Sequence, residues 1–279
     1  MSVIDFILNL AAWILLVNGS MQFGDRENLH RPLTLLGTLK VPKPTIREAW
    51  VLFSVAAVLL VLKSLLLHYL GAPLDTTMHL NFLLLNIFFK TGSMVSMGWM
   101  GVASFLKFTL MAYIWLWVLW RISRKDSAEQ LVGSLKAGLG FVGRMPMVVQ
   151  PILLILFGMI GWFLVGLSFG AFGVLPTSIP LPLLIWQAFW ISISAWVGVY
   201  WMMLLIMIVY LLHSYVYLGS WEGWDWIEGM GDRLLLPLKK LPLQWARIDF
   251  APLLFLLLNW LVYSAFVRLI LHGYQWRPF

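Results

Sequence analysis

Long apolar runs constrain the fold of this chain more than any other feature. Five runs hold at least 20 residues each: Ala49–Leu70, Met94–Trp120, Val148–Leu175, Leu183–Leu212 and Ala251–Leu271. A helix of about 20 apolar residues crosses the hydrocarbon core of a bilayer. Hydrophobic residues make up 61% of the 279 residues and charged residues only 11%, against roughly 25% charged residues in a typical soluble domain. The chain is therefore predicted to be an all-α, polytopic bundle of transmembrane helices.

Two shorter apolar runs need separate treatment. Val3–Val17 has Asp5 and Asn9 as its only strongly polar residues, and neither a basic start nor a small-residue cleavage pattern marks it as a signal peptide. We expect a retained first span, opened by Ser2 with Asp5 three residues on, which is the spacing of a capping box. The ten-residue run Leu80–Phe89 is too short to cross and is predicted to be interfacial or re-entrant. The prediction is six spans.

Basic residues are concentrated in three long linkers, at 18–48, 121–147 and 213–250, which hold fourteen of the 19 Lys and Arg residues. Cytoplasmic segments carry an excess of Lys and Arg, so these linkers are predicted to be cytoplasmic and both termini to lie outside. A seventh span at Leu80–Phe89 would place the first linker on the opposite side of the membrane from the other two. The excess of Lys and Arg on one side would then disappear. The formal charge of +7, placed beside spans, indicates contact with anionic lipid headgroups and no binding of nucleic acid.

The spans pair into three helical hairpins of one integral membrane domain, at 1–72, at 73–182 with the short interfacial segment, and at 183–279. At an offset of 200 residues, the first and third hairpins share eight identities, so we interpret them as diverged repeats. Gly19, Ser20, Asp25, Leu35, Leu36, Lys40, Pro42 and Arg47 match Gly219, Ser220, Asp225, Leu235, Leu236, Lys240, Pro242 and Arg247. Duplication is common in membrane proteins and does not by itself indicate transport.

The third linker carries the most specific pattern. Its leucines are predicted to face the acyl boundary and its cations to reach lipid phosphates: the leucines are Leu234, Leu235, Leu236, Leu238 and Leu241. Two prolines interrupt the helix, an acid is predicted to be the N-cap of the last span, and a third proline lies in that span's first turn. The partner or lipid contact residues predicted here are Arg233, Pro237, Lys239, Lys240, Pro242, Arg247, Asp249 and Pro252.

This order of parts, Pro-Leu-Lys-Lys-x-Pro followed by a spacer and Asp-x-Ala-Pro, resembles the YggT family of small bacterial integral membrane proteins. The resemblance is clear over about residues 205–272 and weak over 1–72. Ala251 stands where the family usually has Ser, and the first copy lacks the Asp-x-x-Pro helix start. The resemblance implies a bacterial inner-membrane protein that helps other membrane components assemble or localise. Relatives are linked with cell division, nucleoid distribution and osmotic tolerance, and in plastids with maturation of a b-type cytochrome complex.

Three cations lie inside predicted spans. Lys107 is thirteen residues from either end of its span, and a cation at that depth is a candidate functional residue with a partner. Because every acid lies in a linker or near a span end, snorkelling, backbone carbonyls and helix C-termini are the alternative partners. Lys63 and Arg268 lie nearer the outer boundary and are predicted to anchor there by snorkelling. His68 and His272 are predicted to pack at the interface, with a haem or metal pair as the alternative.

Two further patterns concern packing and charge. Glycines in the fourth span predict close helix packing; they are Gly158, Gly161, Gly166, Gly170 and Gly173. An acidic cluster precedes the third-linker motif and is interpreted as a solvated loop, a docking face for a basic partner, or a counterbalance to Lys239 and Lys240. Its members are Glu222, Asp225, Glu228 and Asp232.

These observations predict a non-catalytic scaffold or assembly factor that contacts the bilayer and another membrane protein. The alternative is a small-solute or ion transporter or channel, which the duplicated hairpins and Lys107 favour. An enzyme is the least favoured of the three classes. The sequence has no Cys nucleophile, no nucleophile–base pair, no His/Asp/Glu ligand cluster and no phosphate-binding Gly loop. No catalytic residue, cofactor or metal is predicted.

Overall fold

A computed structural model describes residues 3–24, 46–71, 77–123, 129–140, 142–172, 180–215, 222–241, 244–245 and 248–276. The long helices are α1 (Val3–Gly24), α2 (Ile46–Gly71), α3 (Met94–Ile122), α5 (Val149–Ala171), α6 (Leu181–Ser194), α7 (Gly198–Tyr215) and α9 (Ala251–Gln275). Shorter helical elements are α4 (Glu129–Gly138), η2 (Val142–Arg144), η3 (Ala195–Val197) and α8 (Glu222–Leu235). The described residues also form two strand pairs: β1 (Thr77–Phe82) pairs with β2 (Leu85–Lys90), and β3 (Gln244–Trp245) pairs with β4 (Ile248–Asp249).

Six helical stretches are long and apolar enough to cross a membrane. They are Val3–Met21, Arg47–Leu70, Met94–Ile122, Val149–Gly170, Leu181–Ser214 and Ala251–Gln275. Each overlaps one predicted span, so the prediction of an all-α polytopic bundle is confirmed, and the protein is a multi-pass membrane protein. The relation between the first and third hairpins stays a prediction.

The fifth stretch is not one continuous helix, because the 3-10 turn η3 joins α6 to α7. Ser194 Oγ donates a hydrogen bond to the Ile191 carbonyl oxygen at 2.7 Å. A hydroxyl bonded in this way competes with the backbone ladder of its helix. After the turn, the indole of Trp115 on α3 donates to the Gly198 carbonyl oxygen at 3.0 Å, so α3 holds the junction from the side.

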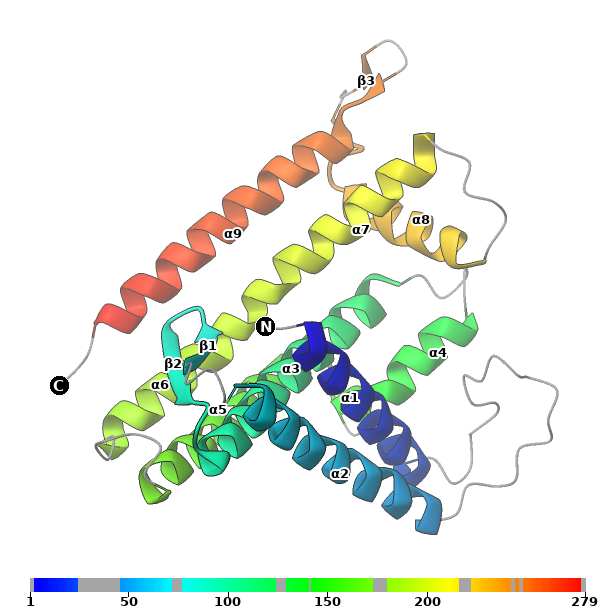
Figure 1. Ribbon diagram of the computed structural model, residues 1–279. Helices are drawn as coiled ribbons and strands as arrows, with labels where there is room; N and C mark the ends of the chain where they lie inside the picture. The colour runs from blue at the N-terminus through cyan, green and yellow to red at the C-terminus, as the bar shows by residue number, and fades with distance from the viewer. Residues whose placement is uncertain are drawn as a thin grey trace.

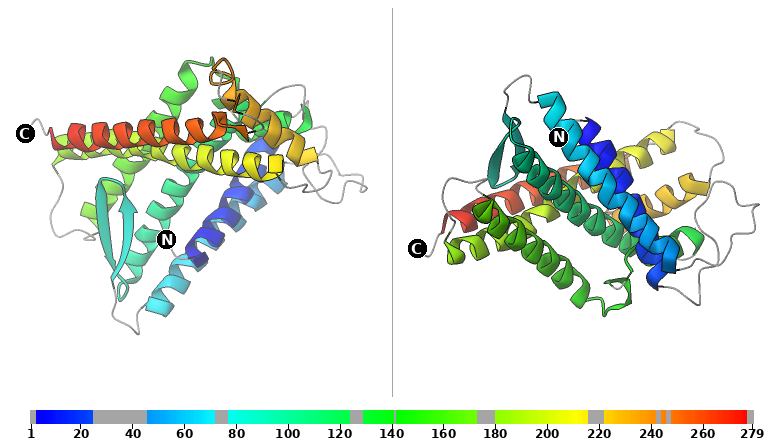
Figure 2. Two further views of the ribbon diagram at one scale, coloured as in Figure 1. Left: turned by 90° about the horizontal axis from the view of Figure 1, so that it is seen from above. Right: turned by 60° about the horizontal axis from the view of Figure 1, so that its bottom comes forward.

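Figure 1 shows α1 and α2 lying side by side and crossing α3, whereas α7 and α9 run along each other. The turned views show the same crossing of the α1–α2 pair over the rest of the bundle (Figure 2). A buried apolar cluster joins α3, α5 and α6 beneath the strand pair β1–β2, with Met97, Phe169 and Leu184 among its members. A second cluster joins α3, α7 and α8 through Ile114, Met202 and Met230.

The run Leu80–Phe89 forms most of a β-hairpin, which the sequence analysis did not predict. β1 and β2 pair antiparallel, from Thr77 opposite Lys90 to Phe82 opposite Leu85. Phe82 and Phe89 are buried, and the Phe82 ring packs against the Trp162 ring on α5 at 4.8 Å. The prediction that this run does not cross as a helix is confirmed, and the all-α description holds for the spans alone.

Residues at the ends of the three linkers lie at one end of the bundle. Trp226 in the third linker donates its indole N–H to Ser123 Oγ in the second, at 2.9 Å. Gly138 in the second linker faces Met21 at the end of α1, where a Cβ built on the glycine would lie 3.4 Å from Met21 Cε. These contacts agree with six spans, since a seventh crossing would separate the first linker from the other two.

Three of the five glycines of the fourth span allow close helix packing, as predicted. A Cβ at Gly158 would lie 2.7 Å from both Leu110 on α3 and Ser192 on α6. A Cβ at Gly161 would lie 2.7 Å from Leu106, and a Cβ at Gly166 would lie closer still to Leu184. Gly170 is exposed and Gly173 lies outside the described residues.

We expect Gly158→Leu to destabilise the bundle, because the new side chain would overlap Leu110 and Ser192 on two sides. Overpacking of this kind typically costs about 1–3 kcal/mol, measurable as a lower midpoint of thermal unfolding in detergent micelles. The matched control is Gly98→Leu on α3, where no atom lies within 4 Å of a built Cβ. Equal midpoints for the two variants would contradict the packing described for α5.

Candidate functional site

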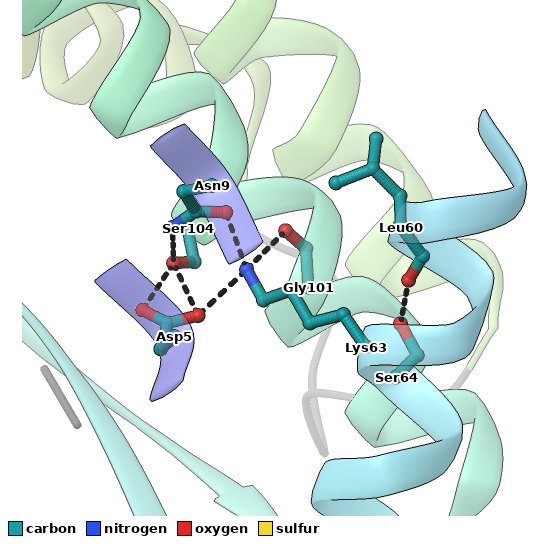
Figure 3. A network of polar contacts seen from close by, with 7 residues as sticks. All are labelled: Asp5, Asn9, Leu60, Lys63, Ser64, Gly101 and Ser104. Atoms are coloured by element: carbon teal, nitrogen blue, oxygen red, sulfur yellow. Dashed lines mark hydrogen bonds and ion pairs between the residues drawn. The ribbon is translucent and has the colours of Figure 1, made fainter. Parts of the chain in front are cut away.

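Polar side chains from three helices meet in one buried group, the Lys63 cluster, formed by Asp5, Asn9, Lys63, Gly101 and Ser104 (Figure 3). Asp5 and Asn9 are four residues apart on α1, so they share one face of that helix. Lys63 comes from α2, and Gly101 and Ser104 come from one face of α3. The four residues with polar side chains, Asp5, Asn9, Lys63 and Ser104, are each 2% exposed or less, so the cluster is sealed from solvent where α1 and α2 cross α3.

The hydrogen bonds of the Lys63 cluster form a closed ring. Lys63 Nζ lies 2.6 Å from Asp5 Oδ1 and donates to Asn9 Oδ1 at 2.6 Å and to the Gly101 carbonyl oxygen at 3.4 Å. The Asn9 amide donates to Ser104 Oγ at 3.0 Å. Ser104 Oγ donates in turn to the Asp5 carboxylate, 2.8 Å from Oδ2 and 3.1 Å from Oδ1. Each of the three ammonium protons of Lys63 therefore has an acceptor.

The charges of the cluster cancel. A lone ammonium or carboxylate in an apolar interior is strongly unfavourable, and it is tolerated when it is paired and its remaining hydrogen bonds are satisfied. Lys63 and Asp5 meet both conditions, with Asn9 and Ser104 completing the ring. The arrangement is that of a structural tie between α1, α2 and α3, because no donor of Lys63 is left over to engage a substrate.

A small residue brings α2 and α3 close enough for this tie. A Cβ built on Gly101 would lie 2.6 Å from Ser64 Oγ on α2. Ser64 itself donates to the Leu60 carbonyl oxygen of its own helix at 3.0 Å. Small residues at helix contacts let backbones approach in membranes, and here that approach puts the Gly101 carbonyl within reach of Lys63.

The structure corrects the sequence analysis at Lys63. This residue was predicted to snorkel to the outer boundary, and it is instead fully buried and paired with Asp5. In the sequence, Asp5 was interpreted as part of a helix start with Ser2, which lies outside the described residues, and not as a partner of Lys63. The four-residue spacing of Asp5 and Asn9 on an otherwise apolar helix was the available signal, because it indicates a polar face that must be buried against something polar.

Lys107 has partners from the β-hairpin. Its Nζ donates to the Asn81 carbonyl oxygen and lies 5.3 Å from the centroid of the Phe82 ring. A backbone carbonyl was one of the alternatives left open for Lys107, and it is the one that the structure selects. The carbonyl and the aromatic face both favour a cation there, so Lys107 holds the tip of the β-hairpin against α3.

Two of the basic residues predicted to reach lipid phosphates make contacts within the chain, and their contact with lipid stays a prediction. The Arg233 guanidinium donates to the carbonyl oxygens of Ile122 and Ser123 at the end of α3, at 3.3 and 3.0 Å. Cations are favourable at a helix C-terminus, where free carbonyls carry negative charge. Lys239 pairs with Asp232 at 2.8 Å, which matches the predicted balance between acidic cluster and basic pair, while Lys240 is exposed.

The leucines of the third linker divide between core and surface, which corrects the prediction that all of them face lipid. Leu235 and Leu238 are buried in a small cluster with Met207 of α7 and Ala251 of α9. In contrast, Leu236 and Leu241 are 57% and 50% exposed. The motif therefore fixes the start of α9 against α7 with one set of side chains and leaves a second set outside.

The remaining motif residues fall as follows. The N-cap of α9 is Phe250, without a side-chain capping bond, so the prediction of Asp249 as N-cap is wrong by one residue. Asp249 belongs to β4, which pairs with β3, and this pairing places it before the cap. Pro252 lies in the first turn of α9, as predicted, and is buried. Pro237 is exposed in the turn after α8, and Pro242 and Arg247 lie outside the described residues.

The two histidines considered as a cofactor pair have separate surroundings. His68 Nδ1 lies 2.8 Å from the Thr91 carbonyl oxygen, and the His272 ring lies 6.1 Å from the Trp276 ring. Within the described ranges, no group of three or more His, Asp and Glu side chains is arranged to hold a metal ion. The contacts observed for both residues are therefore contacts with neighbouring groups of the same chain, and interfacial packing stays a prediction.

Comparison with known proteins adds no relative. No protein-family model, no curated protein and no solved structure matches this chain.

We expect Lys63→Met to destabilise the protein strongly, because Asp5 would be left as an uncompensated buried charge. Removing one partner of a buried pair typically costs about 3–5 kcal/mol, and the midpoint of thermal unfolding in micelles should fall accordingly. The double variant Asp5→Asn/Lys63→Met should be more stable than Lys63→Met alone, since it removes both charges. If the effects of the two substitutions simply add, the two side chains do not interact as described.

Proposed function

We propose that this protein is a non-catalytic scaffold or assembly factor of a bacterial inner membrane, and that α9 packs against a transmembrane helix of another membrane component. One observation carries the proposal. Only 6% of the most apolar stretch of α9 is buried inside the protein, against 33% for those of α3 and α5. A helix with so little of its own chain around it has most of its surface available to a partner.

The contacts of α9 hold it in position without covering it. Its buried residues lie at the two ends, Ala251 and Pro252 at the start, and Ile270 and Tyr274 near the finish. Between them, α9 meets α7 along one seam. Asn259 donates to the Tyr200 carbonyl oxygen at 3.3 Å, and the Tyr263 ring stacks on the Tyr200 ring at 4.2 Å.

The other faces of α9 are apolar and exposed. Leu257, Leu261 and Val262 are 52%, 47% and 67% exposed. Helices in lipid associate through van der Waals packing and interhelical hydrogen bonds rather than through the hydrophobic effect. A helix that is already fixed at both ends loses little conformational freedom on binding, which favours association.

The third-linker motif supports the same role. Buried Leu235, Leu238 and Ala251 fix where α9 begins, while exposed Leu236 and Lys240 stand beside that start. An apolar side chain next to a cation suits the surface of an anionic membrane. The resemblance of this motif to the YggT family and the positive-inside bias support a cytoplasmic position for it and an outer position for both termini.

Photo-crosslinking in native membranes tests this role. We expect a photoreactive amino acid at Leu257 or Leu261 to give a discrete protein adduct, because the proposal places a partner helix there. Val58 on α2 is the matched control, since it is apolar and 66% exposed but lies away from α9. Mass spectrometry identifies the adducts; lipid adducts alone at both α9 positions would exclude the scaffold role of this helix.

A transporter or channel is the second candidate, favoured by Lys107, a cation within a span that contacts a non-helical segment. If the protein conducts solutes, vesicles containing it should release carboxyfluorescein or dissipate a pH gradient faster than empty vesicles. Lys107→Ala should then abolish the flux and Lys240→Ala on the surface should not. We expect no flux above empty vesicles, and a Lys107-dependent flux would overturn the scaffold proposal.

A further inference from the structure

The tip of the β-hairpin lies at membrane depth. Trp117, Trp120 and Arg121 mark one membrane boundary at the end of α3, because Trp and basic residues are enriched at such boundaries. Lys107 is fourteen residues before Arg121, which is about 21 Å along the helix, while the hydrocarbon core is about 30 Å thick. Because Lys107 binds the Asn81 carbonyl, the tip of the β-hairpin lies within the hydrocarbon region.

The base of the β-hairpin lies at the other membrane boundary. The Ser93 N–H, just before α3, donates to the Lys90 carbonyl oxygen at 3.3 Å. Thirteen residues of α3 from Met94 to Lys107 span about 20 Å, and a six-residue strand spans about the same length. Met94 is therefore about 41 Å from Arg121 along α3, about 11 Å more than the hydrocarbon core. The base of the β-hairpin then lies among the headgroups, and the half nearest its tip lies in the hydrocarbon beside α3.

One face of this intramembrane β-hairpin is polar. The register places six residues on the face turned away from the apolar core, and all six are exposed; they are Thr77, His79, Asn81, Asn86, Phe88 and Lys90. Five of these six side chains are polar. The opposite face carries Leu80, Phe82 and Phe89, which are buried in the bundle. The alternation is that of a sheet with one face on a core and the other in water.

The backbone of the β-hairpin also has polar groups that need a hydrogen-bond partner. Phe82 and Leu85 flank a two-residue turn, a geometry in which these two residues exchange hydrogen bonds. The alternate pairs Asn81/Asn86 and His79/Phe88 then direct their N–H and C=O groups to the two edges of the β-hairpin, in the plane of the sheet. Lys107 satisfies the Asn81 carbonyl. In the described part of the chain, no residue bonds the edge N–H and C=O groups of His79, Asn86 or Phe88.

Lipid cannot satisfy these groups, and non-helical backbone at membrane depth occurs where it is buried in protein or faces a water-filled cavity. We propose that the outward face of the β-hairpin lines a water-filled vestibule, open at the hairpin base and reaching the level of Lys107, which admits small hydrophilic solutes. This inference goes beyond the proposed scaffold role and does not depend on it, since a partner on α9 leaves the β-hairpin face untouched.

Cysteine labelling tests the vestibule directly, because the chain has no native Cys. The probe is a membrane-impermeant, sulfonated maleimide, supplied on both sides of lipid vesicles that contain the full-length protein. Asn86→Cys reports on the outward face near the tip and His79→Cys on the same face nearer the base. Ile160→Cys is the control at matched depth; Ile160 is 59% exposed on α5, between Gly158 and Gly161, which contact Leu110 and Leu106 on either side of Lys107.

A maleimide reacts with thiolate, which forms in water and is suppressed in apolar surroundings. We therefore expect Asn86→Cys and His79→Cys to label roughly tenfold faster or more than Ile160→Cys, with all three eluting as the parent protein in gel filtration and all labelling in denaturant. Labelling of Asn86→Cys as slow as that of Ile160→Cys would overturn the proposal, because lipid would then cover the face. Fast labelling in vesicles but protection in native membranes would overturn it too, since a protein partner would then replace the water.

Discussion

The buried pair of Lys63 and Asp5 is the interaction on which the arrangement of the first three helices depends. Apolar side chains give membrane helices little preference for one register over another, because lipid is as apolar as they are. A charge pair sealed from solvent has no such freedom, since each partner is strongly unfavourable without the other. With Asn9 and Ser104 closing the ring and Gly101 allowing close approach, the α1–α2 pair can cross α3 at one place only.

A second cation within the membrane, Lys107, holds the β-hairpin against α3. Lys107 is one turn beyond Ser104, and it binds the hairpin tip through the Asn81 carbonyl and the Phe82 ring. Lys63 on α2 and Lys107 on α3, the two cations within the membrane portion of these helices, therefore each have a partner. Lys63 pairs with Asp5, and Lys107 binds the β-hairpin. The polar side chains of the β-hairpin face away from both, which is why water rather than lipid suits that surface.

The third linker combines a folding role with an exposed surface. Arg233 binds the end of α3, Lys239 pairs with Asp232, and Leu235 and Leu238 pack under Ala251. These contacts position α9, whose middle is left almost uncovered. Three exposed residues near the start of α9 make none of these contacts: Leu236, Lys240 and Leu241. They are the part of the motif that can contact a membrane surface.

The sequence by itself determined the number and approximate positions of the six spans, because hydrophobicity acts through local composition and does not depend on tertiary contacts. The close packing at Gly158, Gly161 and Gly166 was also readable from residue size. Only the tertiary structure decided which acid neutralises Lys63, since Asp5 comes from another helix. It also decided that Leu80–Phe89 forms most of an antiparallel strand pair. The alternation of Thr77, His79 and Asn81 with apolar residues was present, but Leu83–Leu84 has none of the Gly or Asn that marks a tight turn. The contact of Arg233 with the Ser123 carbonyl, 110 residues away, likewise forms only when α8 docks on α3.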